Sequence, residues 1–160
     1  MTSVTDSIRI MAPLEQVYDY CWNAEMWPKI TSHVRQVDLL HAGKDSQRIR
    51  MVVENEGKVY TVESIRHTVP GSSITYQQTT PPVFLTEHSG EWRFSCAGGA
   101  TCVELTHRFE SKKEVARQVL GLAEGADVDS YIGHRLKQNG LLTLSAVKKT
   151  LEQNQPVPMR

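Results

Sequence analysis

The sequence contains no apolar run long enough to span a lipid bilayer. Its opening residues, MTSVTDSIRI, lack the charged start and apolar core of a secretory signal. Lysine plus arginine and aspartate plus glutamate both number 18, and no basic cluster interrupts that balance. A nucleic-acid surface and an anionic membrane surface are therefore not expected. These absences predict a cytoplasmic protein without a membrane or nucleic-acid partner.

Cysteine is scarce and shows no ligand pattern. The three cysteines are Cys21, Cys96 and Cys102. Without a C-x-x-C pair they argue against a disulfide framework and against a zinc site, and reduced thiols are expected. The Gly98-Gly99 pair is better explained as a hairpin turn than as a phosphate-binding loop. His33 and His41 form no metal set with the other histidines, so no metal ion and no cofactor is predicted.

The length and composition suit one globular domain. The chain has 160 residues, of which 39% are hydrophobic and 22% charged, enough to enclose a core and a cavity. Residues 4–11 alternate and predict a strand, and helical spacing follows Pro13. A second short helix is expected over residues 24–30. We expect an interruption at Trp27-Pro28, because the residue before a proline resists the helical conformation.

From Val34 onward the sequence has a period of two for about half the chain. Turn signals occur at residues 42–43, 55–57, 69–72, 80–82 and 97–99, and they divide this region into six strands. Such short connections permit only antiparallel neighbours. The six strands are therefore predicted to run as a meander, and together with the first strand they make a seven-stranded sheet.

The last two strands have the clearest alternation. His88, Gly90, Trp92 and Phe94 share one face of the first strand, and Val103, Leu105, His107 and Phe109 share one face of the second. A turn at residues 97–99 predicts two cross-strand pairs, Trp92 with Val103 and His88 with His107. Both histidines are therefore expected on the apolar face.

Two other strands remain ambiguous. In residues 58–69, KVYTVESIRHTV, one face carries Tyr60, Val62, Ser64 and Arg66, and the other carries Val59, Thr61, Glu63, Ile65 and His67. Periodicity does not choose between these faces. Arg66 is either an ordinary solvated charge or a permanent cation inside an apolar cavity. Residues 73–79 are equally ambiguous, although Ile74 and Tyr76 would normally be placed inside.

The C-terminal region predicts a short helix over residues 114–122 and a long helix that ends near residue 153. Asp127 or Asp129 offers the N-cap of the long helix. Its apolar stripe consists of Ile132, Leu136, Gly140, Thr143, Val147 and Leu151, with Arg135 and Asn139 at the border and Leu141 and Leu142 off it. We expect one domain over residues 1–153 and a disordered tail over residues 154–160. A long helix across a curved sheet leaves an internal cavity, a common place for a small-molecule site.

Several segments resemble a known superfamily. IRIMAPLEQVYDYCWNAEMWP, VESIRHTV, SITYQQTTPP, SGEWRF, AGG and LTHRF are similar to segments of the START or Bet v1-like (SRPBCC) helix-grip proteins, and within them to bacterial polyketide aromatase/cyclases. The resemblance covers nearly the whole chain. It implies an α+β helix-grip fold, in which a seven-stranded curved antiparallel sheet wraps around a long C-terminal helix, with two short helices after the first strand.

The resemblance also implies roles for individual residues. Arg66 falls on a principal catalytic arginine, which implies that it points inward and faces the terminal helix. His107 matches the histidine of the LTH motif, and His88 is a second inward histidine. The expected substrate-binding residues are Trp27, Tyr60, Val62, Ser64, Trp92, Leu105, Arg135, Asn139 and Thr143. Relative to tetracenomycin-type cyclases, four positions depart from the pattern: Val34 replaces a tyrosine, Val62 an aromatic residue, Thr79 a second arginine and His88 a methionine.

The implied reaction is aldol cyclisation and dehydration of a poly-β-ketone, presented by an acyl carrier protein or as a released intermediate. Arg66 would donate hydrogen bonds to a developing enolate or alkoxide, and His88 and His107 would carry protons. A histidine on an inner face is also often an ordinary core residue. The alternatives are a non-catalytic carrier of a lipid, quinone or other hydrophobic molecule, and a structural domain with a filled core. The expected assembly is a monomer or a homodimer.

Overall fold

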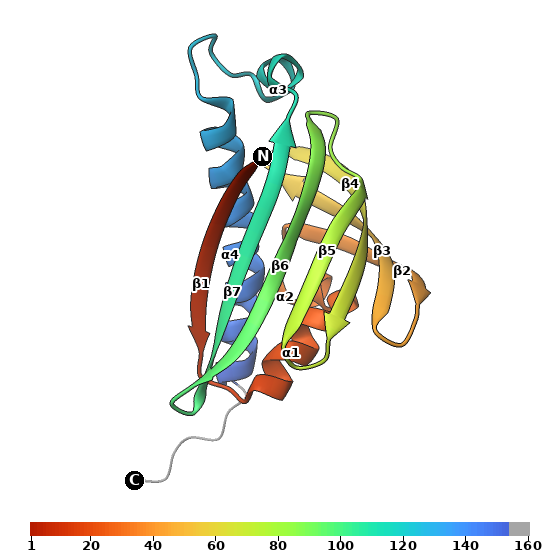
Figure 1. The fold of residues 1–160 in the computed structure, drawn as a ribbon, viewed down its shortest axis with the longest axis vertical. Helices are drawn as coiled ribbons and strands as arrows, with labels where there is room; N and C mark the ends of the chain where they lie inside the picture. Colours follow the sequence, from red (N-terminus) through yellow and green to blue (C-terminus); the bar gives the residue numbers. More distant parts are fainter. Residues whose placement is uncertain (154–160) are drawn as a thin grey trace.

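A computed structural model describes residues 1–153, which form a curved sheet packed against a long helix (Figure 1). The first elements are strand β1 (Thr2–Ile10), helix α1 (Leu14–Trp22), a 3₁₀ turn (Ala24–Met26) and helix α2 (Trp27–Ile30). Six strands follow: β2 (Val34–Ala42), β3 (Ser46–Asn55), β4 (Lys58–Val69), β5 (Ser73–Thr80), β6 (Leu85–Ala97) and β7 (Ala100–Ser111). The last elements are α3 (Lys113–Leu120) and α4 (Val128–Gln153). The tail predicted for residues 154–160 lies outside the described residues.

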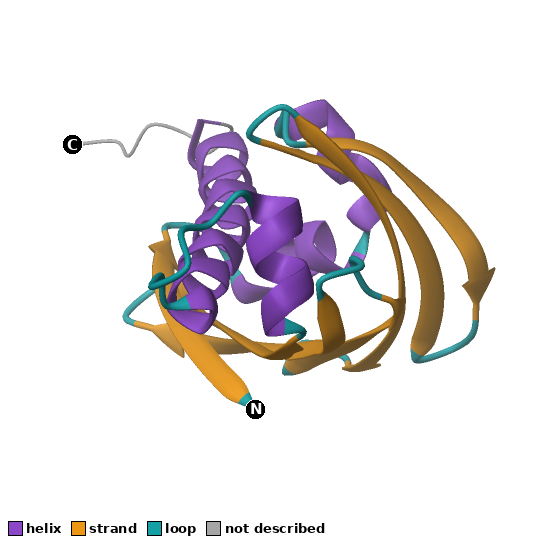
Figure 2. Ribbon diagram, turned by 90° about the horizontal axis from the view of Figure 1, so that it is seen from above, coloured by secondary structure: helices purple, strands orange, loops and turns teal. Residues whose placement is uncertain are grey.

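The strands form one seven-stranded sheet in the order β1-β7-β6-β5-β4-β3-β2. Every neighbouring pair is antiparallel, so β2 to β7 are the predicted meander and β1 pairs with β7. Figure 2 shows the sheet curving around the helices. This arrangement is the helix-grip fold predicted from the sequence.

The hairpin between β6 and β7 is tighter than predicted. Ala97 pairs with Ala100, so the turn consists of Gly98 and Gly99 alone. Both glycines have positive φ angles, 57° and 84°, which allow two residues to reverse the chain. The predicted pairs, His88 with His107 and Trp92 with Val103, are therefore wrong by two residues. The observed pairs are His88 with Phe109, Gly90 with His107, and Trp92 with Leu105.

The helices lie where they were predicted but differ at their ends. Trp27 is helical, with φ −60° and ψ −40°, so the expected break before Pro28 is wrong. Pro28 lies in the first turn of α2, where its missing N–H leaves no hydrogen bond unmade. Helix α3 ends at Leu120 instead of residue 122, because Gly121 adopts the left-handed conformation. Asp127 is the N-cap of α4, since its carboxylate accepts a hydrogen bond from the backbone N–H of Ser130.

Helix α4 buries most of the predicted stripe. Ile132, Gly140, Thr143, Val147 and Leu151 are buried, whereas Leu136 is half-buried. Leu144 is also buried and was not predicted, while Leu142 is exposed. Phe94 packs in an apolar cluster with α1 at one end of the sheet, and Phe109 packs in a second cluster with α3 at the other (Figure 1).

The Gly98-Gly99 turn can be tested by substitution. We expect Gly99→Ala to lower the free energy of unfolding by about 1–2 kcal/mol, because a Cβ strains the backbone at φ 84°. No atom lies within 4 Å of the position that this Cβ would take, so the loss is conformational. Urea unfolding gives the measurement. Gly125→Ala is the matched control, because Gly125 has equally open surroundings without a positive φ. Equal losses in the two variants would contradict the assigned turn.

Candidate functional site

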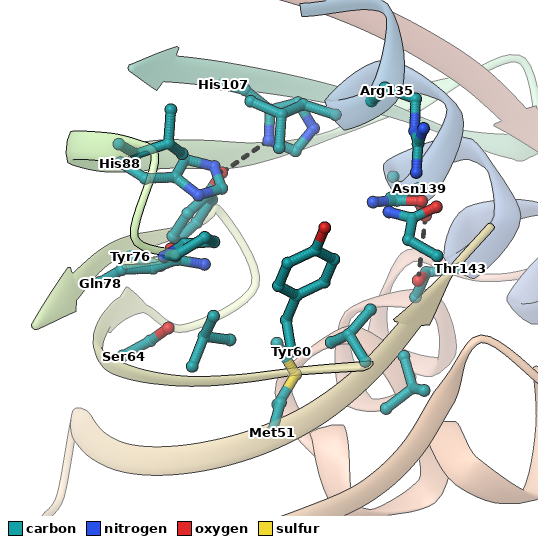
Figure 3. Close-up of a pocket in the computed structure, with 18 of the residues that line it drawn as sticks. Met51, Tyr60, Ser64, Tyr76, Gln78, His88, His107, Arg135, Asn139 and Thr143 are labelled. Atoms are coloured by element: carbon teal, nitrogen blue, oxygen red, sulfur yellow. Dashed lines mark hydrogen bonds between the residues drawn. The ribbon is translucent and has the colours of Figure 1, made fainter. Parts of the chain in front are cut away.

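A cavity of about 180 Å³ lies between the sheet and α4 (Figure 3). For comparison, an engineered cavity of roughly 150 Å³ in another protein holds one benzene molecule. The volume therefore suits about one six-membered ring. Its wall is mainly apolar with a few convergent polar groups, as is usual in small-molecule sites.

Every residue that the sequence singled out as a site residue lines this cavity. These residues are Trp27, Tyr60, Val62, Ser64, Arg66, His88, Trp92, Leu105, His107, Arg135, Asn139 and Thr143. They come from α2, from β4, β6 and β7, and from α4. The structure thus brings the predicted set together. Their catalytic and binding roles remain predictions.

The orientation of β4 answers the question that periodicity left open. Val62, Ser64 and Arg66 are buried, and Tyr60 is half-buried beside them. The opposite set includes the exposed residues Val59, Thr61 and His67. Arg66 is only 2% exposed, so its guanidinium is inside the protein. The prediction that Arg66 points inward is correct.

The guanidinium of Arg66 is held by α1 rather than by the terminal helix. Its Nη2 donates a hydrogen bond to the carbonyl oxygen of Cys21 at 2.7 Å. Its Nη1 donates to the carbonyl oxygen of Trp22 at 3.0 Å and to Gln47 Oε1 on β3 at 2.6 Å. The guanidinium carbon also lies 5.2 Å from the ring centroid of Trp22 and 5.3 Å from that of Trp27. Arg66 therefore lies on the inner face of the sheet, toward α4 as expected, and its guanidinium is anchored by α1 and β3.

These contacts explain how a cation is tolerated in the core. Cys21 and Trp22 end α1, so their carbonyl groups have no partners within the helix. The helix dipole and the two indole faces both favour a positive charge at this place. Burial lowers the pKa of Arg66 to about 10, which still leaves it charged at neutral pH. The residue therefore caps α1 as well as lining the cavity.

Tyr76 connects the two predicted histidines. Its hydroxyl lies 2.9 Å from His88 Nε2 and 2.6 Å from His107 Nδ1 (Figure 3). The ring centroids of His88 and His107 are 5.8 Å apart, so the imidazoles are close although their residues are not directly paired. The three side chains form a continuous hydrogen-bonded cluster on one wall of the cavity.

Both histidines are neutral at physiological pH. Burial lowers the pKa of His88 to about 3, and the neighbouring His107 contributes to this shift. Burial likewise lowers the pKa of His107 to about 4, against a small opposing effect of Asp6. Burial raises the pKa of Tyr76, which keeps its hydroxyl protonated. The cluster therefore carries no charge when the cavity is empty.

The predicted site residues omit five polar residues of the cavity wall: His33, Asn55, Tyr76, Gln78 and Tyr131. Gln78 lies opposite Ser64 in the sheet, and its Oε1 is buried without a hydrogen-bond partner among residues 1–153. His33 lies within hydrogen-bond distance of the hydroxyls of Thr31 and Thr143. The shared face of Tyr76 and Gln78 on β5 was a usable signal, whereas His33 precedes β2 and has no periodic signal.

Arg135 lies at the α3 end of the cavity. Its Nη1 donates a hydrogen bond to the hydroxyl of Tyr131 at 2.7 Å and forms an ion pair with Glu56 at 2.7 Å. The side chain of Arg135 is 13% exposed and that of Glu56 is 69% exposed. This end of the cavity therefore combines a fixed cation with a solvent-facing carboxylate.

Within residues 1–153, no group of three or more His, Cys, Asp or Glu side chains is arranged to hold a metal ion. No helix in that range is long and apolar enough to cross a membrane.

A family model described as "Polyketide cyclase / dehydrase and lipid transport" matches residues 1–152. The chain belongs to this family. The fold agrees with this membership and with the helix-grip architecture expected from the resemblance in sequence.

Characterised relatives belong to polyketide pathways. The chain is 28% identical over 141 residues to the granaticin polyketide synthase bifunctional cyclase/dehydratase of Streptomyces virginiae, covering 87% of this chain and 46% of that protein. It is 32% identical over 130 residues to the actinorhodin polyketide synthase bifunctional cyclase/dehydratase of Streptomyces coelicolor, covering 79% and 40%. The chain thus spans less than half the length of these relatives.

A solved structure of a longer protein also matches the chain over about half of its own length. The di-domain aromatase/cyclase BexL of the BE-7585A biosynthetic pathway superimposes with a TM-score of 0.86 and 34% sequence identity. The match covers 97% of this chain and 51% of BexL. The chain therefore corresponds in length to about half of that di-domain protein.

The contacts of Arg66 predict a role in stability. We expect Arg66→Met to lower the free energy of unfolding by roughly 2–5 kcal/mol, because it leaves the buried carbonyls of Cys21 and Trp22 and the amide of Gln47 without a donor. Urea unfolding measures the loss. Arg48→Met is the control, because Arg48 forms only a solvent-exposed ion pair on the neighbouring strand. Similar losses of unfolding free energy in both variants would show that the hydrogen bonds from Arg66 to the end of α1 do not stabilise the fold.

The buried histidines predict a dependence of stability on pH. Their pKa values are lower in the folded than in the unfolded chain, so below about pH 6.5 the unfolded chain binds protons that the folded chain does not. Stability is then complete above that pH and falls as the pH falls. Between about pH 6.5 and pH 5 we expect a loss of up to about 2 kcal/mol per histidine.

Urea unfolding of His88→Gln over this pH range tests the assignment. The variant should lose less stability on acidification than the wild type. His134→Gln is the control, because His134 is exposed on α4 and should leave the pH dependence unchanged. If the unfolding free energy of His88→Gln depended on pH as steeply as that of the wild type, the assignment of a buried neutral imidazole to His88 would be wrong.

Proposed function

We propose that the chain catalyses intramolecular aldol cyclisation and dehydration of a poly-β-ketone segment held in the cavity. One observation carries the proposal: a buried cation and a neutral, hydrogen-bonded pair of histidines line a space of about one ring. The pathways named for the relatives support the same chemistry.

Arg66 has donors left for a substrate oxygen. A guanidinium has five N–H groups, and three of them make the hydrogen bonds to Cys21, Trp22 and Gln47. The Nε–H and the second Nη2–H are not used in these three hydrogen bonds. In an enclosed site these donors would stabilise a developing enolate or alkoxide. The cap on α1 fixes the direction in which they point.

The histidines are suited to moving protons rather than to holding charge. Neutral imidazole accepts a proton at one nitrogen and donates from the other. The low pKa values of His88 and His107 in the empty cavity make them weak bases there. An enolate forming beside them would favour the protonated imidazole, which raises the effective pKa during the reaction.

The proposed reaction is balanced without a cofactor. A base removes a proton from the carbon between two carbonyl groups, and the resulting enolate carbon bonds to a second carbonyl carbon. The alkoxide formed there takes up a proton. Loss of this hydroxyl with a further α-proton releases one water for each ring and leaves a carbon–carbon double bond. Enolisation of the remaining ketones completes the aromatic ring.

The remaining lining residues would position the substrate. The rings of Trp27 and Trp92 stack at 5.7 Å with an interplanar angle of 27°, and they offer flat faces to a planar intermediate. Tyr60, Val62, Ser64, Leu105, Asn139 and Thr143 complete the wall. Arg135 would bind an oxygen-rich or anionic end of the chain near α3.

The partner in this proposal is a polyketide on an acyl carrier protein or a released intermediate. A soluble location in the cytoplasm, as a monomer or a homodimer, would suit such a partner. The proposal covers only the cyclisation and dehydration step and does not extend to other activities of the longer relatives.

The activity can be tested with a poly-β-ketone thioester mimic and mass spectrometry. The wild-type protein should shift the products toward a cyclised species lighter by one water per ring than its precursor. His107→Gln should slow this conversion by about 10²-fold or more, as expected for loss of a proton-transfer group. His67→Gln is the control, because His67 is exposed on the outer face of β4.

The same experiment distinguishes a cyclase from a non-catalytic carrier. A carrier would bind the mimic and release it unchanged. An unaltered product distribution in the presence of the wild-type protein would overturn the proposed cyclisation.

A further inference from the structure

We propose that Tyr76 is a positioning residue that couples His88 and His107 into one proton relay, so that both imidazoles always adopt the same tautomer. Its hydroxyl contacts both imidazoles, at 2.9 Å from His88 Nε2 and 2.6 Å from His107 Nδ1. The catalytic consequence rests on the proposed function, whereas the coupling of the tautomers does not.

The sheet register brings Tyr76 to this place. Tyr76 on β5 pairs with Arg66 on one side and with Gly90 on the other, and Gly90 pairs in turn with His107. The four residues therefore form a row across four adjacent strands. Tyr76 and His107 are separated in this row by a residue without a side chain.

Gly90 provides the space through which Tyr76 reaches His107. A Cβ at Gly90 would lie 2.4 Å from Tyr76 Cε1 and 2.3 Å from the carbonyl oxygen of Thr106. Contacts this short do not occur in proteins, so any side chain at this position would displace the tyrosine ring. The absence of a side chain at Gly90 is thus a condition for the hydrogen bond between Tyr76 and His107.

The Tyr76 hydroxyl has a single proton, and this couples the tautomers of His88 and His107. A tyrosine hydroxyl donates one hydrogen bond and accepts others, so it can donate to only one of the two imidazoles. If it donates to His107 Nδ1, then His88 Nε2 must be the donor to Tyr76, and both histidines carry their proton on Nε2. If it donates to His88 Nε2, both carry their proton on Nδ1. In one mixed state both imidazoles donate to the tyrosine oxygen, and the tyrosine proton needs another acceptor. In the other mixed state both imidazoles present a lone pair, and the single hydroxyl proton can satisfy only one of them.

The first arrangement agrees with the two distances. The 2.6 Å contact with His107 has the length of a bond donated by a hydroxyl, and the 2.9 Å contact with His88 has the usual length of an N–H···O bond. Both histidines are then protonated on Nε2. His107 Nε2 is buried against Gly140 and has no partner among the described residues.

The relay would move a proton without creating a buried ion. A proton taken up at His88 Nδ1 is matched by transfer from His88 Nε2 to Tyr76, from Tyr76 to His107 Nδ1, and release from His107 Nε2. Each N–H or O–H bond that breaks is replaced by one that forms, and all three groups stay neutral. This agrees with the strong penalty that burial places on either imidazolium. Release at His107 Nε2 requires the substrate alkoxide to reach this atom, which is packed against Gly140 in the empty cavity.

Nitrogen-15 NMR of histidine-labelled wild-type protein near neutral pH tests the coupling without a variant. The expected result is that the signals of His88 and His107 both have the chemical shifts of the Nε2–H tautomer. Opposite tautomers for the two residues would overturn the proposal, because they would leave either the tyrosine proton or one imidazole lone pair unpaired in this cluster.

Tyr76→Phe provides the second test. Loss of the hydroxyl should release the tautomers, so that at least one histidine becomes a mixture of both. Tyr20→Phe is the control, because Tyr20 is outside the cavity wall and should leave both histidine signals unchanged. Unchanged tautomers in a folded Tyr76→Phe protein would contradict the coupling.

Activity gives a third reading. With the poly-β-ketone mimic, Tyr76→Phe should slow cyclisation by about 10²-fold with little change in binding of the mimic. The double variant Tyr76→Phe/His88→Gln should be no slower than the slower single variant, because both changes break one relay. If the rate reductions of the two single variants multiplied in the double variant, the two residues would not act in one relay. An inactive wild-type protein with matched tautomers would instead reject the proposed function and retain the coupling.

Discussion

The structure depends on how one buried positive charge is stabilised. Arg66 lies on a central strand, and its charge is stabilised by the carbonyl end of α1, by Gln47 and by two indole faces. Because those carbonyls lack partners within the helix, α1 requires the arginine as much as the arginine requires α1. The contact therefore fixes α1 against the sheet and closes one end of the cavity. A residue that stabilises the fold in this way is also held rigidly enough to serve as a preorganised donor.

The same row of the sheet connects this cation with the histidine cluster. Gln47, Arg66, Tyr76, Gly90 and His107 are consecutive cross-strand neighbours on β3 to β7. A row of neighbours across a sheet is set by backbone hydrogen bonds, so the distance between the guanidinium and the imidazole of His107 does not depend on flexible loops. Only Gly90 interrupts the side chains, and the ring of Tyr76 fills that gap. The chemistry of the site is in this sense a property of the strand register.

The sequence was informative wherever a residue's neighbours were local. Alternation predicted β6 and β7, and helical spacing predicted α1 and α4, because those patterns depend on residues a few positions apart. The orientation of Arg66 required the family resemblance, since both faces of β4 have similar polarity. The register of the last hairpin was mispredicted by two residues, because it depends on the φ angles of Gly98 and Gly99. Tyr76 was missed for a related reason: its role comes from His88 and His107, on strands whose pairing the local pattern does not specify.

Cavity size limits what this arrangement can do in one step. A space of about 180 Å³ accepts roughly one ring, so most of a long poly-β-ketone would remain outside the enclosed part while one segment reacts. The ring would then form where Arg66 and the Tyr76 cluster face the same volume. The rest of the chain would lie toward Arg135 and Glu56, at the end of the cavity that reaches solvent. Excluding water from one segment alone strengthens the hydrogen bonds that act on it and leaves the other ketones hydrated. Under the proposed function, selection of a single ring closure would follow from the volume that the sheet and α4 enclose.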